Sequence, residues 1–148
     1  MMRKIVYIAG VLAWAASVQA DVVINEVLAN EPGGVRSLEW IELYNDSETP
    51  AFLSFVELFV YSSTDTTSFL LGGSMGSKSY LVLCRNSIRF EEYWGDSSGV
   101  WGDHALEGYA IRELSFQLTN LDGRAVLFSL SNLLSEFAWD RSGEDGHS

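Results

Sequence analysis

The sequence predicts an all-β fold, either a sandwich or a barrel. Short β-type runs recur along the chain, and turn-forming clusters separate them. No long stretch places its apolar residues at helical spacing, so helices are not expected to form the core. Because the chain has 148 residues, we expect a single domain behind a short N-terminal leader.

Eight strands are expected, and turn clusters such as Pro32-Gly33-Gly34 and Asn45-Asp46-Ser47 set their limits. Asp122-Gly123 lies between two apolar runs and predicts a β-hairpin, because glycine adopts positive φ without steric cost. Residues 38–44 are mainly apolar on both faces, which predicts a central strand. The expected strands are Val22–Ala29, Leu38–Tyr44, Val56–Tyr61, Ser68–Leu71, Tyr80–Arg85, Phe116–Thr119, Ala125–Ser129 and Glu136–Trp139.

Two connections are informative. Residues 89–95 predict one helical turn, followed by a loop rich in glycine and charge over residues 99–108. Residues 72–79 are close to the phosphate-binding pattern G-x-x-x-x-G-K-[ST], but Ser77 replaces the second glycine and a strand follows, so we expect a hairpin loop.

Most of the core is expected from Trp40, Ile41, Leu43, Leu81, Leu83, Phe116, Leu118 and Leu127.

Residues 1–20 have the layout of a secretory signal peptide. Arg3 and Lys4 precede a 13-residue apolar run, and small residues lead up to a cleavage site between Ala20 and Asp21. A transmembrane anchor needs about 20 apolar residues, and this run is shorter. The prediction is therefore a secreted or cell-envelope protein with no transmembrane span, whose folded domain covers residues 21–148.

The composition excludes several classes of partner. Loss of Arg3 and Lys4 with the leader takes the net charge from −11 to −13. Nucleic-acid binding depends on Lys and Arg displacing counterions, so a chain this acidic is not expected to bind nucleic acid or an anionic membrane. Cys84 is the single cysteine and lies in an apolar run, so we expect it to act as a small buried hydrophobe and to form no intramolecular disulfide.

Two motifs near the start of the domain resemble the lamin tail domain family. The first is Ile24-Asn25-Glu26-Val27, and the second is Glu39-Trp40-Ile41-Glu42-Leu43-Tyr44-Asn45. The resemblance continues to Ser148 and implies an immunoglobulin-like β-sandwich of a mostly non-catalytic kind, similar to secreted prokaryotic members. Phe55-Val56 replaces the Gly-Trp pair usual in the family, and the chain ends where the family's last strand normally runs on. We therefore expect a sandwich shortened at its end or, preferably, a fragment of a longer protein.

No catalytic residue or cofactor is predicted. The two histidines are His104, in the glycine-rich loop, and the penultimate His147, and there is no G-x-S-x-G nucleophile motif. Glu26, Glu39 and Glu42 lie on adjacent strands in the family fold, where a carboxylate pair would raise one pKa. A compact sandwich offers little cleft for a glycosidase site, so we expect Glu26 and Glu42 to accept hydrogen bonds from the strand-end backbone.

Calcium is the metal that best fits the loop carboxylates, because hard cations take several oxygen ligands from loops. Zinc would lack sufficient soft ligands. None of the acidic residues shows EF-hand spacing, so a solvated acidic surface is preferred over a calcium site. The candidates are Asp140, Glu144 and Asp145, with Asp96, Asp103 and Asp122 as further loop carboxylates.

Three functions remain open at this point. The preferred one is a non-catalytic extracellular module that contacts an unknown protein or a surface glycan, or serves as a spacer in a larger protein. The second is an accessory domain of a secreted hydrolase or nuclease. The third is a calcium-dependent or carbohydrate-binding module, for which the aromatic loop Tyr93–Trp101 offers stacking surfaces.

Overall fold

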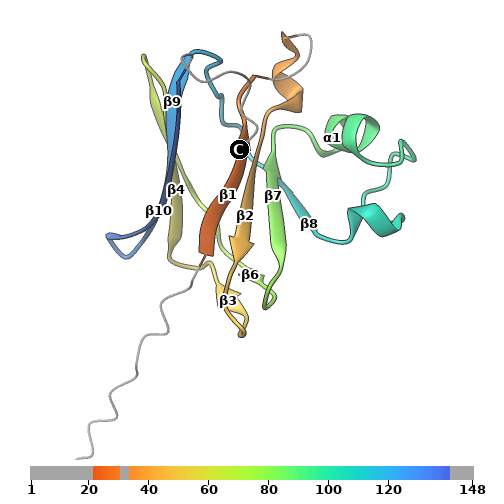
Figure 1. Cartoon of the computed structure of the whole chain (residues 1–148), viewed down its shortest axis with the longest axis horizontal. Coiled ribbons are helices and arrows are strands. Elements are labelled where there is room, and N and C mark those ends of the chain that lie inside the picture. Colours follow the sequence, from red (N-terminus) through yellow and green to blue (C-terminus); the bar gives the residue numbers. More distant parts are fainter. Residues whose placement is uncertain (1–21, 31–33, 141–148) are drawn as a thin grey trace, which may run out of the picture.

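The chain forms an immunoglobulin-like β-sandwich of two four-stranded sheets, as the sequence predicted (Figure 1). The computed structural model describes residues 22–30 and 34–140. The first sheet has the order β1 (Val22–Leu28), β2 (Trp40–Asn45), β7 (Tyr80–Cys84), β8 (Ala110–Glu113). The second has the order β10 (Asn132–Asp140), β9 (Asp122–Ser129), β4 (Val56–Tyr61), β5 (Thr66–Leu70). A short ladder joins β3 (Ala51–Phe52) to β6 (Ser74–Met75).

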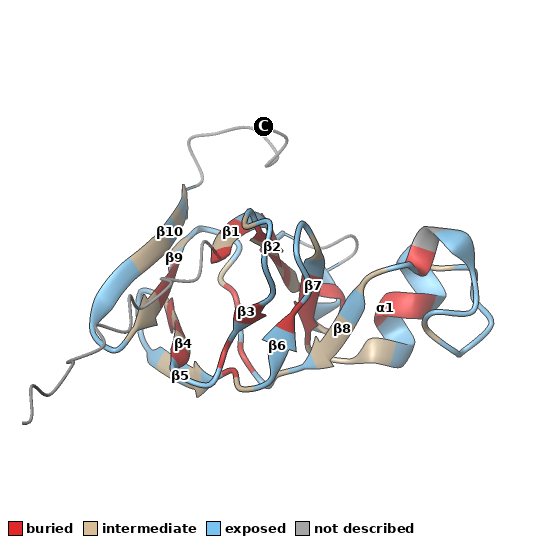
Figure 2. Cartoon of the chain, turned by 90° about the horizontal axis from the view of Figure 1, so that it is seen from below, coloured by how far each residue is buried: buried red, intermediate tan, exposed pale blue. Residues whose placement is uncertain are grey.

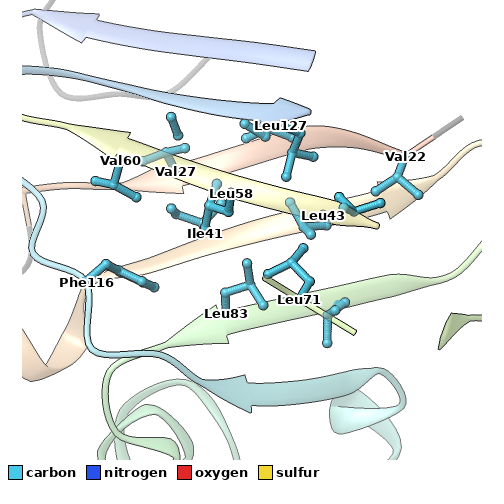
Figure 3. Close-up of a cluster of buried hydrophobic side chains, with 14 of the residues drawn as sticks. Val22, Val27, Ile41, Leu43, Leu58, Val60, Leu71, Leu83, Phe116 and Leu127 are labelled. Atoms are coloured by element: carbon cyan, nitrogen blue, oxygen red, sulfur yellow. The ribbon is translucent and has the colours of Figure 1, made fainter. Parts of the chain in front are cut away.

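The core lies between the two sheets (Figure 3). Alternation along the strands fills it: in β2, Ile41 and Leu43 point inward, while Trp40, Glu42 and Tyr44 occupy the outer face. Because each inward side chain faces the opposite sheet, one alternating pattern supplies both a core face and an outer face. Seven of the eight predicted core residues are confirmed: Ile41, Leu43, Leu81, Leu83, Phe116, Leu118 and Leu127.

Trp40 is the exception. It lies on the outer face of the first sheet, where it packs with Val82, Cys84 and Phe90 in a second apolar cluster. The prediction that Trp40 belongs to the main core is therefore wrong, because even-numbered positions of β2 point away from the second sheet. The prediction of a central strand is confirmed, since β2 lies between β1 and β7.

Hydrogen bonds join the two sheets at both sides of the sandwich. The chain of β1 shifts register between Ile24 and Glu26, which leaves Asn25 as a bulge opposite β2. On the other flank of β1, the backbone N–H of Ile24 donates to Oγ of Ser135 in β10 at 3.0 Å. On the opposite side of the sandwich, the Arg112 guanidinium of β8 donates to the carbonyl of Leu71, just after β5.

Two sequence predictions in the C-terminal half are wrong. Residues 116–119 are extended, but they join neither sheet. Phe116 and Leu118 still point into the core, and the Leu118 N–H donates to the Glu39 carboxylate at 3.0 Å instead of to a neighbouring strand. Asp122-Gly123 does not form a turn but begins β9, and the hairpin turn lies at Leu130-Ser131, where φ is 47° and 73°.

Residues 72–79 carry the chain from β5 in one sheet to β7 in the other, so the segment is a crossover and not the predicted hairpin loop. A strand follows it, as predicted, and no helix. The other long connection runs from β7 to β8 and contains α1 (Ser87–Trp94) and η3 (Ala105–Glu107). This connection, residues 85–109, protrudes from the sandwich (Figure 2) and is called the excursion below. A single turn, η2 (Arg36–Leu38), precedes β2.

The predicted signal peptide and its cleavage site, Ala20-Asp21, lie outside the described residues. Within residues 22–30 and 34–140, the helices are all too short and too polar to cross a lipid bilayer.

Candidate functional site

The excursion exists because β8 runs parallel to β7. Ala110 at the start of β8 pairs with Leu81 near the start of β7, so the chain leaving Cys84 must return along the whole length of β7. Parallel neighbours require a crossover of a dozen or more residues. The excursion returns over the outer face of the first sheet, where Phe90, Trp101 and Tyr109 cover Val82 and Cys84.

The helix of the excursion is anchored at its N-terminus. Asn86 is the N-cap, and its side-chain oxygen accepts a hydrogen bond from the Arg89 N–H at 2.8 Å. The Glu113 carboxylate of β8 accepts from both the backbone N–H and the hydroxyl of Ser87, at 2.8 and 2.7 Å. These hydrogen bonds lower the pKa of Glu113, and together they tie the start of α1 to the sheet.

Two buried glutamates hold the loop that follows α1. Glu91 and Glu107 are only 1% and 2% exposed. The Glu107 carboxylate accepts hydrogen bonds from the backbone N–H groups of Asp96 and Gly102, at 2.7 and 3.0 Å. Glu91 accepts one from Gly99 at 2.8 Å. The loop from residue 95 to residue 102 is therefore closed around two carboxylates, and sequence reasoning did not single out either of them.

These glutamates form an acidic group with Asp96, because one oxygen of each carboxylate lies within 4.8 Å of the others. Of the loop carboxylates that the sequence offered for calcium, Asp96 is in this group, whereas the three main candidates are not. Asp140 lies at the end of β10, and Glu144 and Asp145 lie outside the described residues. Both oxygens of Glu107 and one oxygen of Glu91 already accept backbone N–H groups, and the Ser98 hydroxyl donates to the other oxygen of Glu91, which accounts for their burial without a cation.

A continuous series of aromatic rings lies on the outer face of the first sheet. Neighbouring ring centroids are 4.7, 6.3, 5.4, 5.2 and 6.3 Å apart along the series, distances typical of favourable aromatic pairs. The series begins and ends on β2 and passes through β7 and the excursion. We call it the aromatic arc, and in order it comprises Tyr44, Tyr80, Tyr109, Trp101, Phe90 and Trp40.

Glu42 lies on the same face of β2 as the two end members of this arc. It lies between Trp40 and Tyr44 on the outer face of β2 and pairs across the sheet with the buried Val82. Its carboxylate accepts a hydrogen bond from the Asn25 amide at 2.7 Å. Burial raises the pKa of Glu42, the Asn25 hydrogen bond lowers it, and the charge of Glu26 raises it further. The balance is an increase, so the ionised form of Glu42 is disfavoured at this position.

Glu26 is the direct cross-strand neighbour of Glu42. Like charges facing each other across an antiparallel pair are destabilising. The ion pairs among the described residues involve neither carboxylate, and the expected hydrogen bonds to strand-end backbone are not formed by Glu42. Burial, and then the charges of Glu42, Glu26 and Glu107, raise the pKa of the Tyr109 hydroxyl.

The other family-motif residues support the fold. Ile24, Ile41 and Leu43 are buried in the core. Glu39 is fully buried, and it is this residue, rather than Glu26 or Glu42, that accepts a backbone N–H. The Asn45 amide is also fully buried and donates to the carbonyls of Thr49 and Gly76, at 2.9 and 2.6 Å. Asn45 therefore holds the loop after β2 against the segment at Gly76. Asn45-Asp46-Ser47 has the Asn-x-Ser pattern of N-glycosylation, but the Asn45 amide is buried in the folded domain.

Groups considered for catalysis occupy separate places. Cys84 is buried in β7, where desolvation raises the pKa of its thiol to about 12, so it stays protonated at neutral pH. His104 is exposed in the loop before η3, and His147 lies outside the described residues.

The immunoglobulin-like sandwich and its two motif strands agree with one known family. The family model of the lamin tail domain matches residues 15–136. The chain belongs to the lamin tail domain family. Lamin tail domains are immunoglobulin-like and non-enzymatic, which agrees with the fold described above. No curated protein matches the chain.

Proposed function

We propose that this lamin tail domain is a non-catalytic extracellular module that binds a basic protein partner through its excursion. The observation that carries the proposal is the set of large apolar side chains that the excursion leaves exposed, among which Tyr93 and Trp94 contact each other. Tyr93 and Trp94 remain 51% and 43% exposed, and Ile88 and Val100 are more exposed still. Exposed aromatic residues gathered in one place are typical of binding surfaces.

The tip of the excursion is held in place before any partner arrives. Backbone N–H groups that donate to Glu91 and Glu107 fix the loop after α1, and hydrogen bonds accepted by Asn86 and Glu113 fix the start of the helix. Preorganisation lowers the entropy lost on binding, so rigid aromatic side chains serve as anchors at low cost. This rigidity favours a binding function for the tip over a flexible spacer.

A basic partner follows from the charge of the chain. Glu92, Asp96 and Asp103 are exposed around the tip, and the predicted mature chain carries a net charge of −13. Charge complementarity raises association rates and excludes acidic competitors. The planes of Tyr93 and Trp94 are 68° apart, so they do not form the flat platform on which a sugar ring stacks. This geometry favours protein over glycan.

Site-specific photocrosslinking tests the proposal. A photoreactive phenylalanine analogue is placed at Trp94 in the exported full chain, and for comparison at Leu133, which is similarly exposed but lies in β10 on the second sheet. We expect one protein adduct, identified by mass spectrometry and basic in composition, from position 94 and none from position 133. Adducts of equal yield from both positions, a glycan adduct, or no adduct in the native host would overturn the proposal.

A further inference from the structure

We propose that the aromatic arc and the carboxylates of Glu42 and Glu26 form a receptor for one arginine side chain of the partner. The inference rests on the proposed function and names the chemistry that the module recognises. It concerns the outer face of β1 and β2, next to the excursion, rather than the apolar tip.

The first argument is the charge of this face. Glu26 and Glu42 are directly opposed across two strands, and the bulge at Asn25 supplies a single amide donor to one of them. Lys78, Arg85, Arg89 and Arg124 form their ion pairs elsewhere, with Asp46, Glu48, Glu39, Glu92 and Glu136. The fold therefore tolerates a repulsive pair of carboxylates on an open face, and a cation from outside the chain would relieve the repulsion.

The second argument is the set of rings around Glu42. Trp40 and Tyr44 flank it on the same face of β2, and the Tyr44 ring centroid lies 4.7 Å from that of Tyr80 on β7. Aromatic faces attract cations, and the attraction grows when water is displaced. Exposed carboxylates alone would attract any cation, whereas carboxylates bordered by rings favour an organic cation with flat faces.

Arginine fits this arrangement better than lysine or a metal ion. Its guanidinium is planar, stacks on aromatic rings and presents paired N–H donors to carboxylates, whereas a lysine ammonium is a strongly hydrated point charge. Calcium requires six to eight oxygen ligands, more than two strand carboxylates offer.

Titration of the mature chain with a short glycine-flanked arginine peptide tests this inference, with NMR shifts as the readout. Two further peptides, in which lysine or the neutral isostere citrulline replaces the arginine, are titrated in parallel. We expect millimolar binding of the arginine peptide that weakens with added salt, and at least about tenfold weaker binding of the other two. Equal binding of citrulline or lysine would overturn the assignment.

Matched variants locate the site. Glu42→Gln and Glu26→Gln should each weaken binding of the arginine peptide by about tenfold, because each removes one partner of a charge-assisted contact. Glu57→Gln, a strand glutamate of β4 on the second sheet, should leave its affinity within about twofold. Equal effects of Glu42→Gln and Glu57→Gln would contradict the inference.

The crosslinking experiment separates this inference from the function on which it rests. If the adduct at position 94 persists while the arginine peptide fails to bind, the receptor is wrong and the proposed function stands. If the peptide binds but position 94 gives no adduct, the proposed function at the excursion tip is wrong.

Discussion

The indole ring of Trp139 lies directly against Gly123, its cross-strand partner in the β9–β10 ladder. A β-carbon at Gly123 would come within 2.3 Å of Cζ2 of Trp139. The ring keeps this position because its Nε1–H donates to the Thr119 carbonyl at 2.7 Å. The glycine thus makes room for a ring that joins β10 to the extended segment before β9.

Gly123→Ala should lower the free energy of unfolding by about 1–3 kcal/mol, because the ring must move and lose its hydrogen bond. Chemical denaturation gives the value. Gly108→Ala is the control, since the nearest atom to its added carbon would be 3.6 Å away. Equal stability of Gly123→Ala and the parent chain would show that Trp139 can shift at no cost.

Glu42→Gln should stabilise the fold at neutral pH. The pKa of Glu42 is raised above its ordinary value of 4.5, so the folded state holds its proton more tightly than the unfolded state. Stability from this group is therefore present below pH 4.5 and is lost as pH rises through the folded-state pKa. Thermal unfolding should show a higher Tm for the variant at pH 7 and a shrinking difference towards pH 4. A lower Tm at pH 7 would contradict this account.

The Leu130-Ser131 turn should be improvable. Both residues have positive φ, the conformation of the two-residue hairpin turn that prefers Asn-Gly. The double substitution Leu130→Asn with Ser131→Gly should raise stability by roughly 1 kcal/mol by relieving left-handed strain. Leu121→Asn, at another exposed leucine, is the control for lost apolar surface. A gain of the same size in that control would remove the turn from the explanation.

Cys84 should resist thiol reagents in the folded protein. Its side chain is buried and its pKa is raised to about 12, so thiolate is scarce at pH 8. Labelling should proceed to completion only in denaturant, at a rate that follows global unfolding. Rapid modification of native protein would show that the excursion opens and exposes β7.

Glu107→Gln should loosen the excursion without unfolding the sandwich. The amide group of glutamine supplies one acceptor where the carboxylate accepts from both Asp96 and Gly102, so a backbone N–H loses its bond. Hydrogen exchange at these two amides should accelerate, while exchange in β4 and β9 stays unchanged. Uniform acceleration across both sheets would mean that the carboxylate stabilises the whole domain.

Strand prediction succeeded where a segment with alternating apolar residues also has a hydrogen-bonded strand on each side. In β4, residues 56–61 alternate between inward and outward positions, and the predicted limits agree with the structure. Phe116–Thr119 alternates in the same way, yet its donor at Leu118 turns to Glu39, which lies 79 residues earlier. Alternation predicts burial, but it does not say whether a hydrogen-bonding strand is available.

The hairpin was misplaced for a related reason. Asp122-Gly123 has the composition of a turn, but Gly123 is needed for the approach of Trp139, whereas the real turn is made by Leu130-Ser131, which has no turn signal.

The aromatic arc was also missed. Its members lie between residues 40 and 109. Tyr44 and Tyr80 meet across the β2–β7 ladder, whereas Phe90, Trp101 and Tyr109 join them because the excursion returns along β7 to a parallel β8. The sequence did single out Tyr93–Trp101 as an aromatic loop, but Trp101 packs inward and Tyr93 and Trp94 remain outside.

The parallel step from β7 to β8 has a consequence for how the domain can diversify. A return path across this sheet is imposed by topology, so a descendant that keeps the strand order must keep a covering segment of a dozen residues or more. The sandwich needs little from that segment beyond the apolar contacts over Val82 and Cys84. Mutation can therefore rewrite its outward side chains while the scaffold is conserved, so relatives with one architecture can acquire different specificities.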